Sequence, residues 1–130
     1  MPHLFLIADD NADNILLMRR LIQRLGKDFD CIEAQTGREA LRLAVERNPE
    51  VILLDMKMPD MDGYETAVAL KSNKSTSTIP VIAVTAQAML GDRERALDAG
   101  CNDYLTKPID PALLVETIKK YIICEPSTGE

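Results

Sequence analysis

Four consecutive apolar residues, Val51-Ile52-Leu53-Leu54, are followed directly by the carboxylate of Asp55. A run of β-branched and leucine residues without alternating polar positions is typical of a strand that is buried on both faces of a parallel sheet. In open α/β sheets, ligands bind just beyond the carboxyl ends of the strands, so a carboxylate at this point is well placed for chemistry. The segment therefore predicts a parallel α/β fold with Asp55 at the functional edge of its sheet.

Short apolar runs of this kind alternate along the chain with segments whose apolar residues recur at helical spacing. Five strand–helix units predict an α/β fold in which helices cover both faces of a parallel sheet. Right-handed crossovers allow few topologies, and the flavodoxin-like (βα)5 doubly wound sheet of strand order 2-1-3-4-5 is a common one at this size. Strands are expected at residues 4–8, 29–34, 51–54, 79–84 and 103–106, and helices at 13–25, from 37, at 64–70, at 92–99 and from 111.

Two local patterns predict helix starts. Thr36 followed by Glu39 has the spacing of a capping box. Asp110-Pro111 combines an N-cap residue with proline at the first helical position. Residues 72–78, by contrast, are all polar, and we expect them to form a loop that does not pack.

Length and charge limit the possible functions. The 130 residues are 46% hydrophobic, which fits one domain, expected at residues 1–124, with a disordered tail at 125–130. The net charge of −6 argues against direct nucleic-acid binding, which usually needs a basic face. No apolar stretch approaches the roughly 20 residues of a membrane span, and the N-terminus lacks the pattern of a signal peptide.

The number and spacing of the cysteines indicate whether they form disulfides or bind a metal. They are three in number and widely separated, which matches neither a disulfide framework nor the spacing of a zinc site. Reduced thiols in a cytoplasmic protein are therefore expected at Cys31, Cys101 and Cys124.

Polar side chains follow the ends of four predicted strands. Strands one and three are neighbours in the expected order, and their ends carry Asp9-Asp10 and Asp55. The next two strands end at Thr85 and Lys107. Crowded carboxylates repel one another, so they either acquire a raised pKa or hold a cation. Because all the expected donors are oxygens, a hard ion such as Mg²⁺ fits this edge of the sheet.

This set of side chains indicates a reaction class. A carboxylate can act as a nucleophile and form an acyl phosphate. Phosphoryl transfer otherwise requires positioning and neutralisation of charge. Mg²⁺ and Lys107 would neutralise the charge, and Thr85 would donate a hydrogen bond. The pattern therefore favours phosphoryl transfer to Asp55.

Four motifs, each at an expected strand end, resemble those of the receiver domain of two-component response regulators. Each motif alone is weak evidence, but their order and positions are specific, and the resemblance covers nearly the whole chain. In its later part the chain is most similar to single-domain regulators of the bacterial cell-division type and to receivers of hybrid kinases. The motifs are Ala8-Asp9-Asp10-Asn11, Leu53 to Gly63, Val84-Thr85-Ala86 and Leu105-Thr106-Lys107-Pro108-Ile109.

The resemblance implies that Asp55 is the phospho-accepting aspartate. It also implies that Asp9 and Asp10 hold Mg²⁺ together with Asp55 and the backbone carbonyl of Lys57. The phosphoryl group would come from a histidine kinase or a histidine phosphotransfer protein. Such a domain is not an enzyme for other substrates, because it catalyses only its own phosphorylation and dephosphorylation.

The resemblance also implies a switch. Lys107 would pair with the phosphoryl group, Thr85 would move to bond it, and Tyr104 would be the aromatic side chain that swings inward behind Thr85. These movements would change the contacts with a downstream target protein. Direct binding to nucleic acid or to a membrane is not expected.

Other interpretations stay open at this point. A small Mg²⁺-dependent aspartyl phosphatase of the haloacid-dehalogenase type also uses a strand-end Asp, but it typically has a second Asp two residues later, where this chain has Lys57. A receiver-like binding module that works without phosphorylation usually lacks the acceptor or an acid partner, and this chain keeps both. Taken alone, Asp9-Asp10 could also be an N-cap for the first helix.

Overall fold

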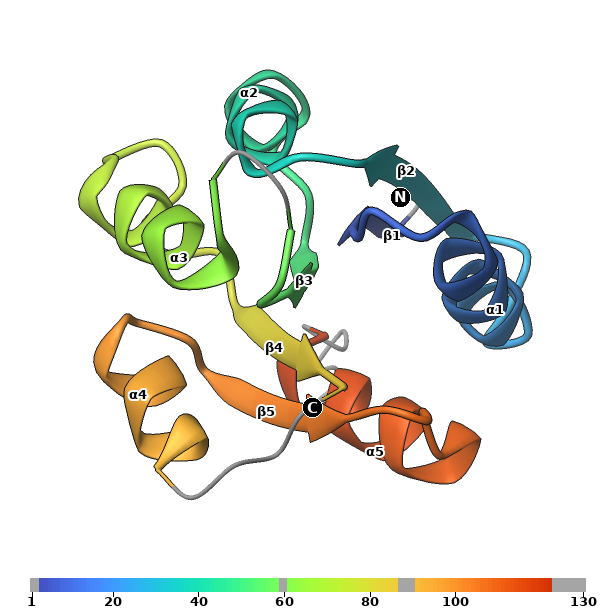
Figure 1. Cartoon of the computed structure of the whole chain (residues 1–130). Helices are drawn as coiled ribbons and strands as arrows, with labels where there is room; N and C mark the ends of the chain where they lie inside the picture. Colours follow the sequence, from blue (N-terminus) through green and yellow to red (C-terminus); the bar gives the residue numbers. More distant parts are fainter. Residues whose placement is uncertain (1–2, 59–60, 87–90, 123–130) are drawn as a thin grey trace.

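The computed structural model describes residues 3–58, 61–86 and 91–122, in which strands and helices alternate along the chain (Figure 1). The strands are β1 (His3–Ala8), β2 (Phe29–Ala34), β3 (Val51–Asp55), β4 (Val81–Thr85) and β5 (Asp103–Thr106). The helices are α1 (Ala12–Gln23), α2 (Gly37–Arg47), α3 (Gly63–Ser72), α4 (Asp92–Asp98) and α5 (Pro111–Tyr121).

The described strands form one parallel sheet in the order β2-β1-β3-β4-β5, which confirms the predicted flavodoxin-like α/β fold. Figure 1 shows α1 and α5 on one face of this sheet and α2, α3 and α4 on the other. The order of the strands reverses between β1 and β3, so the carboxyl ends of these two strands flank the topological switch point.

Alternate residues of each strand pack on opposite faces of the sheet, which gives the molecule two hydrophobic cores. In β3, Ile52 and Leu54 point toward α2 and α3, whereas Val51 and Leu53 point toward α1 and α5. All five residues of β3 are buried, as expected for a strand covered on both faces. Asp55 is the last of these residues, so it lies at the end of a strand that is packed on both faces.

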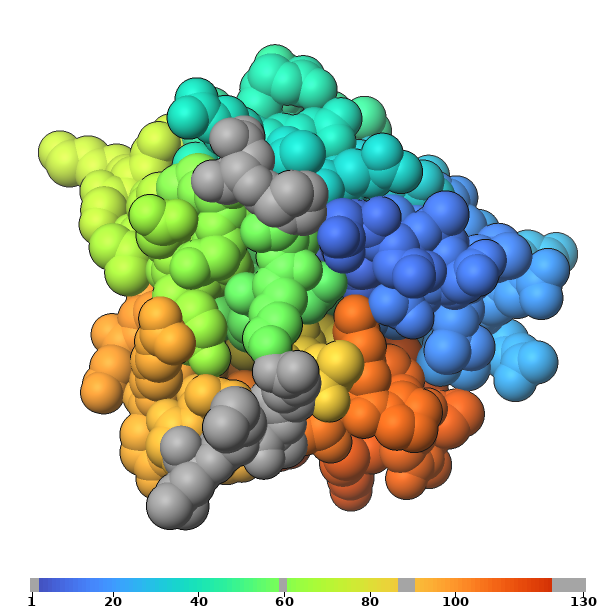
Figure 2. Space-filling view, in the orientation of Figure 1, coloured from blue at the N-terminus to red at the C-terminus, as the bar shows by residue number. Residues whose placement is uncertain are grey.

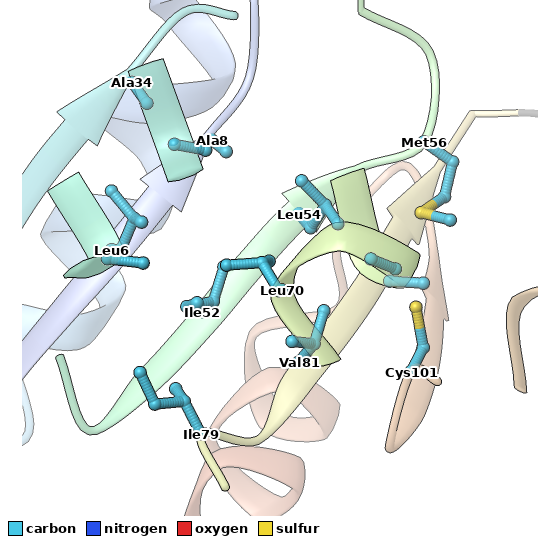
Figure 3. Packing of buried hydrophobic residues seen from close by; sticks show 14 of the residues in the cluster. Leu6, Ala8, Ala34, Ile52, Leu54, Met56, Leu70, Ile79, Val81 and Cys101 are labelled. Atoms are coloured by element: carbon cyan, nitrogen blue, oxygen red, sulfur yellow. The ribbon is translucent and has the colours of Figure 1, made fainter. Parts of the chain in front are cut away.

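Figure 3 shows part of the core under α2, α3 and α4, in which Leu54 and Val81 of the sheet lie near Leu70 of α3. Its buried members are Leu6, Ala8, Ala34, Ala40, Ala44, Ile52, Leu54, Met56, Met58, Ala67, Leu70, Ile79, Val81, Ala83, Ala96 and Cys101. The core under α1 and α5 consists of Phe5, Ile7, Ile15, Met18, Leu21, Ile22, Cys31, Val51, Leu53, Ile82, Val84, Leu105, Leu114 and Ile118.

The capping-box prediction for α2 is half right. The Thr36 hydroxyl accepts a hydrogen bond from the backbone N–H of Glu39 (3.1 Å), but the Glu39 carboxylate accepts from Gln35 (2.8 Å). A complete capping box instead begins α3, where Asp62 and Glu65 each accept from the other's backbone N–H. The α3 box fixes the point at which the chain returns from the end of β3.

The predicted start of the last helix, α5, is confirmed. The Asp110 carboxylate accepts a hydrogen bond from Ala112 N–H (3.0 Å), and Pro111 is the first residue of α5, both as predicted.

Two predictions lie outside the described residues, namely the tail at 125–130 and the state of Cys124. None of the helices within the described ranges is long and apolar enough to cross a bilayer.

The segment 72–78 differs from its prediction. Ser72 still belongs to α3, and Thr76 is fully buried, with its hydroxyl donating to the carbonyl of Leu70 (2.6 Å). Thr76 packs because its hydroxyl satisfies a carbonyl at the C-terminus of α3, so its buried polar group is paired. Residues 72–75 and Thr78 are exposed, as predicted for a polar loop.

The described cysteines are free and buried, in agreement with the expectation of reduced thiols. Burial raises the pKa of both the Cys31 and the Cys101 thiol to about 11. Both side chains therefore stay protonated near neutral pH and pack as small apolar groups.

Leu54→Ala tests the role of the core beneath the edge that carries Asp55. Leu54 is 0% exposed, and we expect its truncation to lower the free energy of unfolding by about 2–5 kcal/mol in urea denaturation. Val68→Ala is the matched control, because Val68 is 51% exposed on α3 and should change stability by no more than about 0.5 kcal/mol. Similar losses in both variants would contradict this packing.

Candidate functional site

Three carboxylates from two strand ends meet at the carboxyl edge of the sheet. Ala8 pairs with Leu54 in the register of β1 and β3, so Asp9 and Asp55, which follow them, become neighbours. One carboxylate oxygen from each of Asp9, Asp10 and Asp55 lies within 4.8 Å of the other two. Asp9 is 0% and Asp55 5% exposed, whereas Asp10 is open to solvent. The edge thus combines two buried carboxylates with one that faces water.

Figure 2 shows the segments that build this edge in contact with one another, coloured blue, green, yellow and orange according to their distant positions in the sequence. The orange segment carries Lys107, which follows β5 and whose backbone N–H donates to the carbonyl of Thr85 (2.8 Å). The Lys107 ammonium lies 3.0 Å from Asp9 Oδ2 and 3.6 Å from Asp55 Oδ2. This side chain therefore joins the end of β5 to both buried carboxylates.

Backbone amides hold the second oxygen of each buried carboxylate. Asp55 Oδ1 accepts a hydrogen bond from Lys57 N–H (3.0 Å), and Asp9 Oδ1 accepts from Asn11 N–H (2.9 Å). The N-cap of α1 is Asn11, whose side chain accepts from two amides of the first turn. The interpretation of Asp9-Asp10 as an N-cap is therefore wrong.

Burial and like charge determine the protonation of Asp55. Removal from water and the neighbouring carboxylate of Asp9 raise the pKa of Asp55, while the Lys57 amide and the Lys107 ammonium lower it, and the resulting value is about 6. The net shift is upward, so the ammonium does not fully compensate the crowded carboxylates. The site favours additional positive charge.

The donor set fits a hard divalent cation. Carboxylate oxygens converge from Asp9, Asp10 and Asp55, and the described residues contribute no sulfur or imidazole to the cluster. Oxygen ligands and at least one solvent-facing carboxylate suit Mg²⁺, which keeps part of its hydration shell. Lys57 joins the site through its N–H, and the role of its carbonyl as a ligand stays a prediction.

Thr85 and Tyr104 lie on neighbouring strands and on the same face of the sheet. Ala83 pairs with Tyr104 in the register of β4 and β5, and strand alternation directs Thr85 to the face of Ala83. Thr85 is buried beside the site, and Tyr104 packs half-buried against the core under α4. The Tyr104 hydroxyl is buried and has no hydrogen-bond partner among the described residues. Tyr104 thus lies on the strand next to Thr85, on the same face of the sheet and two residues further from the edge.

Sequence reasoning missed two residues that shape the site. The backbone of Asn11 holds Asp9, as described above. Gly63 begins α3 so close to β3 that a Cβ at this position would lie 2.7 Å from the carbonyl oxygen of Asp55. Glycine is unfavourable in a helix, so its position at the first helical residue is the signal that would have indicated this close approach.

Comparison with known proteins gives concordant results. A family model described as the response regulator receiver domain matches residues 5–119. The polar-differentiation response regulator DivK of Brucella anthropi is 43% identical to this chain over 122 residues, which cover 94% of this chain and 98% of that protein.

Two solved structures share the fold. A putative response regulator from Chloroflexus aurantiacus has a TM-score of 0.87 at 30% identity, over 93% of this chain and 98% of the other. The receiver domain of the sensor histidine kinase PA1611 from Pseudomonas aeruginosa, with a magnesium ion coordinated in its active site cleft, has a TM-score of 0.84 at 31% identity, also over 93% and 98%. On fold and sequence, this chain belongs to the response regulator receiver domain family.

Proposed function

We propose that this chain accepts a phosphoryl group on Asp55 from a histidine kinase or a histidine phosphotransfer protein. The observation that supports this most directly is the convergence of Asp55 with Asp9, Asp10 and Lys107 at the switch point of the sheet. Membership of the receiver family supports the same reaction and makes the two rivals, an aspartyl phosphatase and a phosphorylation-independent module, less favoured.

The reaction is a nucleophilic displacement at phosphorus. A carboxylate oxygen of Asp55 attacks the phosphorus of a phosphohistidine, and the P–N bond breaks. The imidazole nitrogen leaves with the electron pair of that bond, and Asp55 becomes an acyl phosphate. The hydrogen bond from Lys57 N–H to Asp55 Oδ1 orients the carboxylate for this attack.

Charge neutralisation is the main requirement of this reaction. Mg²⁺ held by Asp9, Asp10, Asp55 and the backbone carbonyl of Lys57 would supply positive charge for both the nucleophile and the phosphoryl group. The Lys107 ammonium already contacts Asp9 and Asp55, so it is within reach of phosphoryl oxygens on Asp55.

The acyl phosphate acts as a switch. It adds a charge of about −1.5 to −2, if it resembles other phosphorylated side chains. The buried Thr85 hydroxyl then bonds a phosphoryl oxygen, and Tyr104 follows into the space behind Thr85. These movements bias a two-state surface formed by α4, β5 and α5, which binds a downstream target protein in the cytoplasm.

The raised pKa of Asp55 predicts a pH-dependent stability in Mg²⁺-free buffer. The unfolded chain loses the Asp55 proton near its ordinary pKa of 3.8, whereas the folded protein keeps it to about 6. The Asp55 contribution to the unfolding free energy therefore falls as pH rises from about 4 to 6 and stays low above that range. Asp55→Asn should remove this slope and be more stable than wild type at pH 7, by on the order of 2–3 kcal/mol in urea denaturation. Parallel pH profiles of the two proteins would contradict the shift.

Asp55→Asn should also abolish labelling by acetyl phosphate in Mg²⁺, because an amide is not a competent nucleophile. The measurement is the intact mass of the protein after incubation with the donor. Asp28→Asn is the control, since Asp28 is exposed before β2 at the opposite edge of the sheet and loses the same charge. Undiminished labelling of Asp55→Asn would show that another residue is the acceptor.

Thr85→Ala should leave labelling of Asp55 largely intact and weaken the response to it. The hydroxyl is proposed to bond the phosphoryl group only after transfer, so its loss removes the switch and spares the chemistry. The measurement is the affinity of labelled protein for a target captured with labelled wild type. Equal affinities of labelled Thr85→Ala and labelled wild type for this target would contradict the proposed role of Thr85.

A further inference from the structure

Gly37 occupies the first position of α2, where it is buried and has helical, not left-handed, backbone angles. Alanine would be the better residue there on helical propensity, by roughly 0.5–1 kcal/mol for a helix interior. The backbone conformation therefore does not require glycine at this position. Glycine is required because the neighbouring atoms leave no room for a side chain.

The space is taken by the connection between β3 and α3. A Cβ on Gly37 would lie 2.7 Å from the carbonyl oxygen of Met61 and 3.0 Å from its Cβ, and it would also collide with Thr66 Oγ1. The Thr66 hydroxyl is not free to turn away, because it donates to the carbonyl of Asp62 (2.8 Å) in a fully buried position. The N-terminus of α2 thus abuts the backbone of Met61 without a side chain in between.

Met61 belongs to the same short connection that carries Lys57. At the start of this connection, Lys57 N–H donates to Asp55 Oδ1, and the carbonyl of Met56 accepts from Gly63 N–H (3.2 Å). Gly63 follows Met61 by two residues, and Met56 directly precedes Lys57, so this backbone hydrogen bond connects the two described parts of the connection. The side chain of Met56 is buried, which leaves it little room to absorb a displacement. A shift at Met61 is therefore passed on toward Lys57.

We propose that Gly37 is a positioning residue for the cation site: by admitting the backbone of Met61 against α2, it sets the place of the Lys57 backbone beside Asp55. The proposal rests on the proposed function, because it takes the Lys57 carbonyl as a ligand for Mg²⁺. Gly37 itself touches neither the ion nor the phosphoryl group. Its effect comes from the close approach of α2 to the connection after β3.

Gly37→Ala tests this assignment through Mg²⁺ affinity, measured by isothermal titration calorimetry of the unphosphorylated protein. We expect the Kd for Mg²⁺ to rise about threefold to tenfold, somewhat less than the loss of a group that contacts a ligand directly. Ile118→Val is the control for reduced stability, since Ile118 is buried in the core on the opposite face of the sheet. It should lower the melting temperature and leave the Kd unchanged.

Thr66→Val changes the same contact from the side of α3, because it places a methyl group where the hydroxyl faces Gly37. This variant tests the proposal if Gly37→Ala does not fold. It should also weaken Mg²⁺ binding, and amide NMR signals of Lys57 and Met61 should shift in the Mg²⁺-free variants but not in Ile118→Val. Affinities within twofold of wild type, or a weaker affinity with unmoved Lys57 signals, would overturn the role of Gly37. Wild type that fails to bind Mg²⁺ would instead overturn the proposed function itself.

Discussion

Two buried carboxylates at the ends of neighbouring strands are the constraint on which the site depends. Asp9 and Asp55 are removed from water on the same edge, and like charges in such a position are unfavourable unless positive charge is near. Lys107 supplies part of it from the end of β5. The remaining excess of negative charge would favour a bound cation, and this preference connects the fold to its proposed chemistry.

The fold provides the surroundings that make this arrangement stable. A sheet covered on both faces fixes the strand ends, because alternate residues of β3 are locked into two separate cores. Backbone amides of Asn11 and Lys57 then hold one oxygen of each carboxylate, and the Lys107 ammonium lies near the other oxygen of each. The charges therefore cannot relax by moving apart.

Much of this could be predicted from the sequence because it depends on local patterns. The apolar run before Asp55 and the regular alternation of elements predicted the sheet, its order and the meeting of the acidic residues, although their catalytic roles remain proposals. Side-chain geometry was less accessible. The pattern at Thr36 could not tell which backbone amide Glu39 would contact, and the burial of Thr76 depends on a carbonyl of α3. The close approach at Gly37 is tertiary and has no local signature beyond a glycine inside a helix.

The most direct test of the central claim is the pKa of Asp55, measured from the carboxyl carbon by NMR titration with and without Mg²⁺. Crowding and burial predict a pKa near 6 in the Mg²⁺-free protein. Saturating Mg²⁺ should lower it well below that value, because the ion favours the charged carboxylate. A pKa near the ordinary 3.8 that does not respond to Mg²⁺ would show that this edge neither crowds charge nor holds a cation.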